Sequence, residues 1–463
     1  MSRLRLPGWR VPLLRRRPPD PDILASPEMG VPAAPATEAG RRPLQQTFRA
    51  FKHRNYRLYY FGQSVSLSGT WMQTIAQSWL VIQLTDSKTA LGTVTMLQFL
   101  PITFLVLFAG VIADRVPKRR FVMFTTSLAG AQALVLGLLV LAGVVELWHV
   151  YVLALVLGLA NALEQPTRQA FIVDIVGKKD LMNAVALNSG MFNGARLVGP
   201  AIGGVAIAAF GVEVAFLFNA ASFLAVLVAL FLMQPSEFHQ EQRRATAAGN
   251  AMRELREGIS FVLHTPATLL IVILGATLGT FGYNFIVVLP LIAKYVLDGG
   301  AAELGFLTAS LGLGALISAL LLAGRASATK FTLFAGAIAF AALLASIAVS
   351  QWFLLTLPLL FALGLANTAF AATANTSLQL AAPDRLRGRV MSVWMLLVAG
   401  STPIGGFATG FLADHIGVQE AVGINAALCT LGVTAALIYY LSHEKEIAMT
   451  ADASRLVAVA EEG

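Results

Sequence analysis

Three ionisable residues interrupt apolar stretches of this 463-residue sequence and are the first candidates for chemistry. Glu164 and Arg168 are four residues apart, so on a helix they share a face and can form an ion pair. Arg196 lies about 13 residues into the next apolar stretch, or about 20 Å along a helix. A buried carboxylate that loses its cation favours the protonated form. The pattern predicts proton exchange at Glu164 with Arg168 or Arg196 as alternating partners, and a permanent ion pair that braces two helices fits it equally well.

The composition indicates what surrounds these charges. Hydrophobic residues make up 57% of the chain and charged residues only 13%, whereas soluble proteins usually carry about a quarter charged residues. This much apolar surface indicates a membrane protein and excludes disorder for most of the chain. The single cysteine, Cys429, excludes an intrachain disulfide and a cysteine-ligated metal site, and the six histidines form no metal-binding motif. We therefore expect no metal and no cofactor.

Twelve apolar segments follow a region rich in proline and arginine, residues 1–47, which we expect to be a disordered cytoplasmic tail. Each segment has about 20 residues or more, enough to cross a bilayer core of about 30 Å as a helix. The predicted fold is therefore an all-α integral membrane protein with twelve transmembrane helices. These predicted spans are 57–84, 90–112, 121–143, 149–173, 183–209, 213–233, 267–296, 303–323, 331–350, 353–379, 388–412 and 419–441.

The charges in the loops predict the orientation of the spans, because Lys and Arg favour the cytoplasmic side. Every second loop is basic, and the intervening loops carry mainly acidic residues, with Lys88 as the main exception. Both termini are therefore expected in the cytoplasm of a bacterial cell, with the chain in the cytoplasmic membrane. The net charge of +8 follows from this topology, so nucleic-acid binding is not expected.

A long polar interruption divides the spans into two sets of six. We expect an N-terminal bundle at 48–233, a helical linker on the cytoplasmic surface at 234–266, a C-terminal bundle at 267–442 and a cytoplasmic tail at 443–463. Short sequences recur in the same order in both bundles. They are Ile202-Gly203-Gly204 before Phe210-Gly211-Val212, and Ile404-Gly405-Gly406 before Ile416-Gly417-Val418. Parallel repeats of this kind predict a transporter whose substrate site lies between two pseudo-symmetric halves.

The loop between the second and third spans contains Gly110-Val-Ile-Ala-Asp114-Arg115-Val-Pro-Lys118-Arg119-Arg120. It resembles the loop signature of the major facilitator superfamily. The resemblance implies a latch in which Asp114 accepts amide hydrogen bonds from the start of the eleventh span and holds the cytoplasmic side shut. The alternative is that the basic cluster only sets the topology. Asp174, at the end of the fourth span, is expected to neutralise Arg115 or Arg119. The gate residues expected from this resemblance are Gly110, Asp114, Arg115, Arg119, Asp174 and Arg389.

The fifth span contains Gly194-Ala-Arg-Leu-Val-Gly199-Pro200-Ala-Ile-Gly203-Gly204, which resembles the glycine–proline motif of the antiporter branch of the same superfamily. Glycines permit close helix contact and proline bends a helix. In that branch the motif packs against the partner half and is associated with export; the alternative is a packing seam without directional meaning. Three further stretches resemble a bacterial subgroup that includes enterobactin-exporter-like and drug efflux proteins. They are Asn55-Tyr56-Arg57, Gln165-Pro166-Thr167-Arg168-Gln169 and Arg387-Gly388-Arg389-Val390-Met391-Ser392.

Polar residues in the first, fourth, seventh and tenth spans are candidates for the substrate cavity, since these spans line the pathway in the superfamily that the chain resembles. Hydrogen bonds between helices, typically worth about 0.6 kcal/mol per pair, are the alternative use of such residues. The candidates are Gln73, Gln77, Asn161, Tyr283, Asn284, Asn367 and Asn375.

These features together predict a monomeric secondary transporter that exports a small organic molecule, such as a drug-like compound or a siderophore, in exchange for protons. An importer or facilitator of a small metabolite is the runner-up. A membrane-embedded enzyme is disfavoured, because the spans contain no cluster of catalytic residues. A channel or receptor would not predict two similar halves with a loop latch, and the sequence contains no phosphate-binding loop of an ATP-driven pump.

Overall fold

The computed structural model describes residues 48–239, 251–323, 329–398 and 400–446, without the side chains of 106–115 and of a few residues at helix ends. The predicted tail at 1–47 and most of the predicted tail at 443–463 lie outside the described residues. The described residues form helices and short connections, and no strand occurs among them. The all-α class predicted from the sequence is therefore confirmed.

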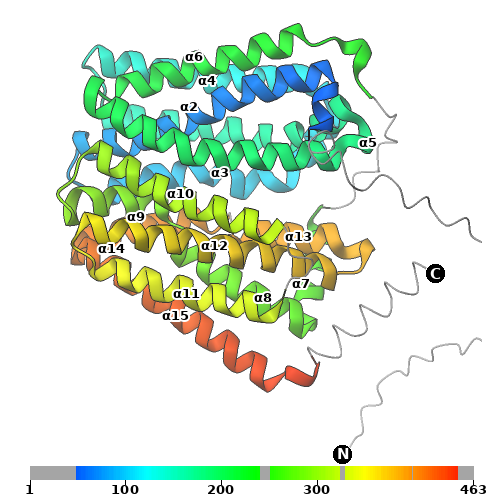
Figure 1. Ribbon diagram of the computed structural model, residues 1–463, viewed down its shortest axis with the longest axis vertical. Coiled ribbons are helices and arrows are strands. Elements are labelled where there is room, and N and C mark those ends of the chain that lie inside the picture. The colour runs from blue at the N-terminus through cyan, green and yellow to red at the C-terminus, as the bar shows by residue number, and fades with distance from the viewer. Residues whose placement is uncertain (1–47, 240–250, 324–328, 399, 447–463) are drawn as a thin grey trace, which may run out of the picture. The chain divides into compact units, whose positions relative to one another are not determined.

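The N-terminal bundle follows a short 3-10 helix, η2 (Arg49–Lys52), and consists of five helices by backbone trace (Figure 1). The longest, α5, has 64 residues and contains two predicted spans, because its backbone turns sharply at Gly177. The φ of Gly177 is 70°, in the left-handed region that glycine adopts readily. The helices are α2 (Arg54–Leu84), α3 (Lys88–Arg115), α4 (Lys118–Leu141), α5 (Leu147–Phe210) and α6 (Glu213–Leu232).

The C-terminal bundle lies below the first in Figure 1 and is coloured lime to red. It is preceded by α7 (Ala251–His264), the part of the predicted helical linker that the structure describes; residues 240–250 lie outside the described part. The helices of the bundle are α8 (Pro266–Thr277), α9 (Phe285–Leu291), α10 (Ala301–Ala323), α11 (Lys330–Val349), α12 (Phe353–Ala381), α13 (Asp384–Val398), α14 (Thr402–Ile416) and α15 (Val418–Ser442).

Helices occupy all twelve predicted spans. Nine helical segments among the described residues are long and apolar enough to cross a membrane, and the doubled α5 is one of them. The first two predicted spans are occupied by α2 and α3, which have 31 and 28 residues. That each of the twelve crosses the bilayer stays a prediction.

The seventh predicted span is interrupted rather than continuous. It consists of α8, a π-helical turn, the connecting residues Tyr283 and Asn284, α9 and a second π-helical turn. Pro290 within α9 has no amide hydrogen to donate to the carbonyl of Ile286. Ser78 of α2 compensates, because its hydroxyl lies 3.5 Å from that carbonyl. Interrupted helices of this kind form the substrate sites of many transporters.

The eleventh predicted span is also divided, into α13 and α14. Pro403 lies in the first turn of α14, where its missing amide hydrogen costs nothing. The carbonyl of Gly400, between the two helices, accepts a hydrogen bond from Thr103 of α3 at 3.3 Å. Both interrupted spans therefore present free carbonyls that side chains of the other bundle satisfy.

Two glycines mark equivalent points in the two bundles. Gly211 precedes α6 with a φ of 93°, and Gly417 precedes α15 with a φ of 105°. Asn219 and Asn425 follow these glycines at the same spacing, and both are buried. The repeat read from the sequence thus has matching backbone geometry, as expected of pseudo-symmetric halves.

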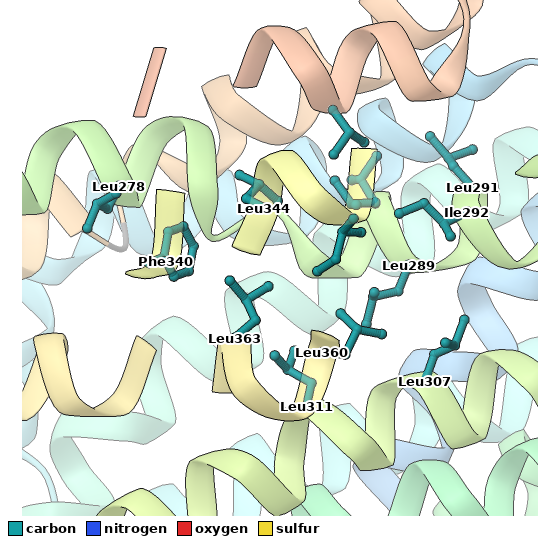
Figure 2. Packing of buried hydrophobic residues seen from close by; sticks show 14 of the residues in the cluster. Leu278, Leu289, Leu291, Ile292, Leu307, Leu311, Phe340, Leu344, Leu360 and Leu363 are labelled. Carbon is teal, nitrogen blue, oxygen red and sulfur yellow. The ribbon is translucent and has the colours of Figure 1, made fainter. Parts of the chain in front are cut away.

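Aliphatic and aromatic side chains form the core of the C-terminal bundle. Figure 2 shows buried side chains of this core, among them Leu289 of α9, Leu311 of α10, Leu344 of α11 and Leu363 of α12. The same apolar cluster continues into the N-terminal bundle through buried residues of α2, α3 and α6. A separate apolar cluster fills the other end of the N-terminal bundle, around the start of α2. The shared core therefore joins the bundles at one end.

Candidate functional site

Small residues form the seam between the two bundles. A Cβ atom added at Gly204 of α5 would lie 2.5 Å from the carbonyl oxygen of Ala301 and 2.8 Å from Cα of Gly305 on α10. A Cβ added at Gly92 of α3 would lie 2.8 Å from the carbonyl oxygen of Gly406 on α14. Both crossings lie toward the end that the loop charges predict to be extracellular. Backbones this close leave no room for water at these two crossings.

The glycine–proline motif is divided between two partners. Gly199 and Gly203 pack against Trp71 and Met72 of α2, within the N-terminal bundle. Pro200 and Gly204 pack against Gly305 of the C-terminal bundle. The expectation that the motif contacts the other half therefore applies to one of its two faces.

We expect Gly204→Ala to prevent this seam from closing, because the added methyl group overlaps backbone atoms that cannot rotate away. Transport should fall at least ~10-fold, while Gly194→Ala on the same helix should keep wild-type activity, since a Cβ at Gly194 meets only open space. Alanine at Gly194 should also raise helix stability by about 1 kcal/mol. Uptake of a fluorescent substrate into membrane vesicles measures the difference, and equal activity of the two variants would refute the role of the seam.

Asp414, near the end of α14, caps the first turn of α3 in the other bundle. Its carboxylate accepts hydrogen bonds from Ser87 Oγ at 2.8 Å and from the backbone amides of Lys88 and Thr89 at 2.8 and 2.9 Å. The amides at a helix N-terminus have no partners within the helix and carry a partial positive charge, so a carboxylate is the favoured cap. This contact joins the two bundles at the predicted extracellular end.

Lys88 adds a second set of contacts at the same place. Its ammonium lies 3.8 Å from the Asp414 carboxylate and 4.8 Å from the ring centroid of Tyr295. The Tyr295 hydroxyl lies 3.4 Å from the carbonyl oxygen of Asp86. Lys88 was the main basic residue in the loops expected to be acidic. Its contacts with the other bundle explain why a lysine occurs there.

Sequence reasoning missed Asp414, although a signal was present. Gly110-Val-Ile-Ala-Asp114 at the end of α3 and Gly410-Phe-Leu-Ala-Asp414 at the end of α14 share the pattern Gly-x-x-Ala-Asp. The second copy lies at the opposite end of the protein from the first. A search for the first motif elsewhere in the chain would have identified Asp414.

The predicted cytoplasmic gate is described only in part, because the side chains of Asp114 and Arg115 lie outside the described residues. Asp174 pairs with Lys118 at 2.6 Å. Its expected pairing with Arg115 or Arg119 stays a prediction, because the side chain of Arg115 lies outside the described residues. Arg119 instead donates to the carbonyls of Leu230 and Phe231 at the end of α6, at 2.8 and 3.0 Å. Unpaired carbonyls at a helix C-terminus attract cations, which explains why Arg119 binds there.

Arg389, expected at the gate, pairs with Glu257 of the linker helix α7. Glu257 also lies 3.7 Å from Arg253, one turn earlier on α7. The backbone of Arg389 lies so close to Gly258 that a Cβ there would approach its carbonyl oxygen to 2.7 Å. The linker helix is therefore fixed to the start of α13.

A buried carboxylate anchors the first residues of the described chain. Asp180, just after the turn of α5, has a side chain only 2% exposed and forms ion pairs with Arg49 at 2.8 Å and Lys52 at 2.6 Å. His53 Nε2 lies 2.9 Å from the same carboxylate. The sequence analysis did not single out this cluster, because its partners are about 130 residues apart in the chain.

We expect Asp180→Asn to lower the free energy of unfolding by about 1–3 kcal/mol, because three cationic or polar partners lose a buried anion. Lys179→Gln, which changes an exposed neighbour, should leave stability unchanged within about 0.5 kcal/mol. Thermal unfolding of the purified protein in detergent measures both. Identical melting temperatures for the wild type and Asp180→Asn would show that the cluster does not anchor η2.

Glu164 and Arg168 lie together on α5, with Arg168 Nη1 3.5 Å from Glu164 Oε1. Both side chains are largely buried, at 13% and 23% exposure. Thr125 and Thr126 of α4 lie beside the carboxylate, and Tyr59 of α2 lies within electrostatic range of both charges. The structure thus brings together the first two members of the predicted proton site.

Arg196 lies elsewhere. Its guanidinium carbon is 5.8 Å from the ring centroid of Trp71, and its charge lies within electrostatic range of Tyr283. Trp71 belongs to α2 and Tyr283 to the interrupted seventh span, so Arg196 faces side chains of both bundles. Glu164 is not among the groups that contact Arg196 in this conformation.

Three predicted cavity residues are instead used inside the bundles. Gln73 donates to Gln132 at 3.0 Å and accepts from Asn219 at 2.6 Å, and it is 2% exposed. Gln77 donates to Gln98 at 2.8 Å. Asn284 faces α14, where it donates to Thr409 at 3.4 Å. For these residues the structure favours the alternative of hydrogen bonding between helices.

For the other four cavity candidates a role in substrate binding stays a prediction. Tyr283 Oη and Asn367 Oδ1 are buried, and neither has a hydrogen-bond partner among the described residues. Asn161 is half-buried on α5, one turn before Glu164. Asn375 is exposed near the end of α12 and accepts a hydrogen bond from Gln379 at 2.6 Å.

The helices in the predicted spans, the seam of small residues and the repeated Gly-x-x-Ala-Asp pattern describe one architecture. Residues 45–460 match a family of major facilitator transporters described as transmembrane secretion effectors. The chain belongs to this family. Its members are multi-pass membrane transporters, so the resemblance read from the sequence is confirmed.

Two curated relatives cover nearly the same region of this family member. The staphyloferrin A transporter of Staphylococcus aureus is 25% identical over 397 residues, which cover 84% of this chain and 96% of that protein. The multidrug efflux pump Tap of Mycolicibacterium fortuitum is 28% identical over 396 residues, which cover 82% of this chain and 95% of that protein. Both similarities extend across the two bundles.

Solved transporters have the same fold. A bacterial homologue of the human lysosomal transporter Spinster superposes with a TM-score of 0.61 at 15% identity and covers 90% of this chain and 98% of its own. A POT family transporter superposes with a TM-score of 0.65, also at 15% identity, over 85% of this chain and 96% of its own. These matches confirm the major facilitator fold.

Proposed function

We propose that this transporter exports a small organic molecule across the bacterial cytoplasmic membrane and that protons moving inward drive the export. The observation that carries the proposal is the buried Glu164–Arg168 pair, at 3.5 Å, within a bundle whose seam to its partner closes at one end. The names of two relatives, a siderophore transporter and a multidrug efflux pump, support a drug-like or siderophore substrate. Both termini lie in the cytoplasm, and one chain is the working unit.

Proton coupling follows from the chemistry of the pair. In the described conformation the Arg168 guanidinium lies 3.5 Å from Glu164 and favours its charged form. When the Arg168 side chain changes rotamer during the transport cycle and moves away, the carboxylate is left without its cation, and Glu164 then takes up a proton. Return of Arg168 releases that proton on the other side.

Alternating access requires two closures that exclude each other. The described contacts between the bundles, such as Thr103 with Gly400 and Asp414 with α3, lie from the membrane middle to the predicted extracellular end, and we infer from them a state that is open to the cytoplasm. Asp414 caps α3 in this state. In the opposite state Asp114, at the other end of α3, would cap the start of α13. The second and eleventh predicted spans thus carry a latch at each end of the protein, and each latch forms when the other is broken.

The direction of transport is tested in inverted membrane vesicles that contain the full chain. With the vesicle interior acidified by respiration, we expect ethidium to accumulate inside, and a protonophore should abolish the accumulation. Vesicles with Glu164→Gln serve as the matched control. Accumulation only in right-side-out vesicles would replace the exporter with an importer, and accumulation that a protonophore leaves unchanged would exclude proton coupling.

A further inference from the structure

One cation near the middle of the protein lacks an anionic partner. Away from the span ends, Glu164 is the single acidic residue of the predicted spans, whereas Arg168 and Arg196 are both basic. Glu164 is already paired with Arg168 at 3.5 Å. Among the described residues no carboxylate forms an ion pair with Arg196. An isolated charge at membrane depth is costly, so such residues usually serve a substrate or an ion.

Arg196 lies on the seam between the two bundles. On α5 it shares a helix face with Gly199 and Gly203, which pack on α2. Its own carbonyl oxygen lies against α10 of the other bundle, 3.0 Å from where a Cβ of Gly312 would be. Its side chain is half-buried, and the seam is closed on the extracellular side of it. The guanidinium therefore belongs to a residue on the predicted cytoplasmic side of the crossing at Gly204.

The groups around Arg196 are aromatic rather than acidic. Trp71 lies under the guanidinium at 5.8 Å and also packs edge-on against Phe192, with 6.0 Å between ring centroids. Tyr283 approaches from the other bundle, and its buried hydroxyl has no hydrogen-bond partner among the described residues. A guanidinium binds a carboxylate with two parallel hydrogen bonds, while aromatic faces accept a flat apolar body.

We propose that Arg196 binds a carboxylate, or another anionic group, of the exported molecule, and that Trp71 and Phe192 hold the adjoining apolar part. The proposal rests on the proposed export function and makes organic anions with an aromatic or otherwise apolar body its preferred substrates. A cation such as ethidium lacks the contact with Arg196 and is carried more weakly. Tyr283 of the opposite bundle completes the site by donating a hydrogen bond to the same anion. The substrate thereby contacts both bundles, as alternating access requires.

Two xanthene dyes of opposite charge test the proposal on the full chain in nanodiscs. Carboxyfluorescein is anionic and rhodamine 123 is cationic, while their ring systems are alike. Fluorescence polarisation should show that the wild type binds carboxyfluorescein at least ~10-fold more tightly than rhodamine 123. The anionic dye forms a charge-assisted hydrogen bond with Arg196, whereas the cationic dye is repelled by it. This comparison needs no variant.

Three variants then locate the binding. Arg196→Gln should weaken carboxyfluorescein binding at least ~10-fold and leave rhodamine binding unchanged or tighter, and Arg196→Lys should weaken carboxyfluorescein binding less. Arg256→Gln, at an exposed position of the linker helix, should leave the ratio of the two affinities unchanged. Absence of carboxyfluorescein binding in the wild type, or affinities that do not depend on Arg196, would overturn the proposal. Either result leaves the export function standing, because that function is judged by energised ethidium accumulation in vesicles.

Discussion

Glu164→Gln is expected to reduce pH-driven accumulation of ethidium in inverted vesicles at least ~10-fold while substrate exchange without a pH gradient continues at the wild-type rate. Glutamine has nearly the same shape as glutamate and cannot carry a proton, so a transporter that depends on this carboxyl group loses its driving force but not its pathway. Glu237→Gln, an exposed acid after α6, is the matched control and should be fully active.

The alternative for this residue is a permanent brace between helices. A brace predicts that Glu164→Gln leaves the cation of Arg168 unpaired and lowers thermal stability, with exchange and pH-driven transport lost together. The double variant Glu164→Gln with Arg168→Gln would then recover stability and transport. Full pH-driven accumulation in Glu164→Gln would exclude Glu164 as the proton carrier.

Asp414→Ala should shift the protein toward its outward-open state about 10- to 100-fold, because the closed extracellular end loses three charge-assisted hydrogen bonds. Thr95 offers a readout: it is 2% exposed and lies on α3 against Gly406 of the other bundle. With Cys429 replaced by serine and Thr95 by cysteine, a membrane-impermeant maleimide added to whole cells should react faster in the Asp414→Ala background.

Glu213→Gln provides the comparison for this experiment. Glu213 is also acidic and near the predicted extracellular end, but it contacts the backbone of its own bundle at Gly211. Its replacement should leave the labelling rate of the cysteine at position 95 unchanged. Equal labelling in the Asp414→Ala and unaltered backgrounds would show that the cap on α3 does not hold the extracellular end shut.

The helices were predictable because their length and apolar composition are local properties of the chain. Each predicted span coincides with helix in the structure, and the Gly211 and Gly417 repeat matches in backbone geometry. The interruptions at Tyr283 and near Gly400 were not predicted. Backbone carbonyls at both places accept hydrogen bonds from hydroxyl groups of the other bundle, and such contacts between distant parts of the chain cannot be read from local sequence.

The roles of the polar residues were harder to predict, because they too depend on contacts between distant parts of the chain. A buried glutamine must find hydrogen-bond partners, but the sequence does not say whether these are substrate or protein. For Gln73 they are Gln132 and Asn219, which come from helices far away in the chain. Glu164 and Arg168 were predictable as a pair because four residues of one helix separate them.

The most direct test of alternating access is a pair of distance measurements on the same protein. Spin labels at the exposed positions Phe210 and Val349 report the predicted extracellular end, and labels at Met182 and Leu380 report the predicted cytoplasmic end, each in a Cys429→Ser background. When the pH is lowered or ethidium is added, we predict that one distance lengthens while the other shortens. Two distances that stay fixed, or that lengthen together, would contradict the transport mechanism.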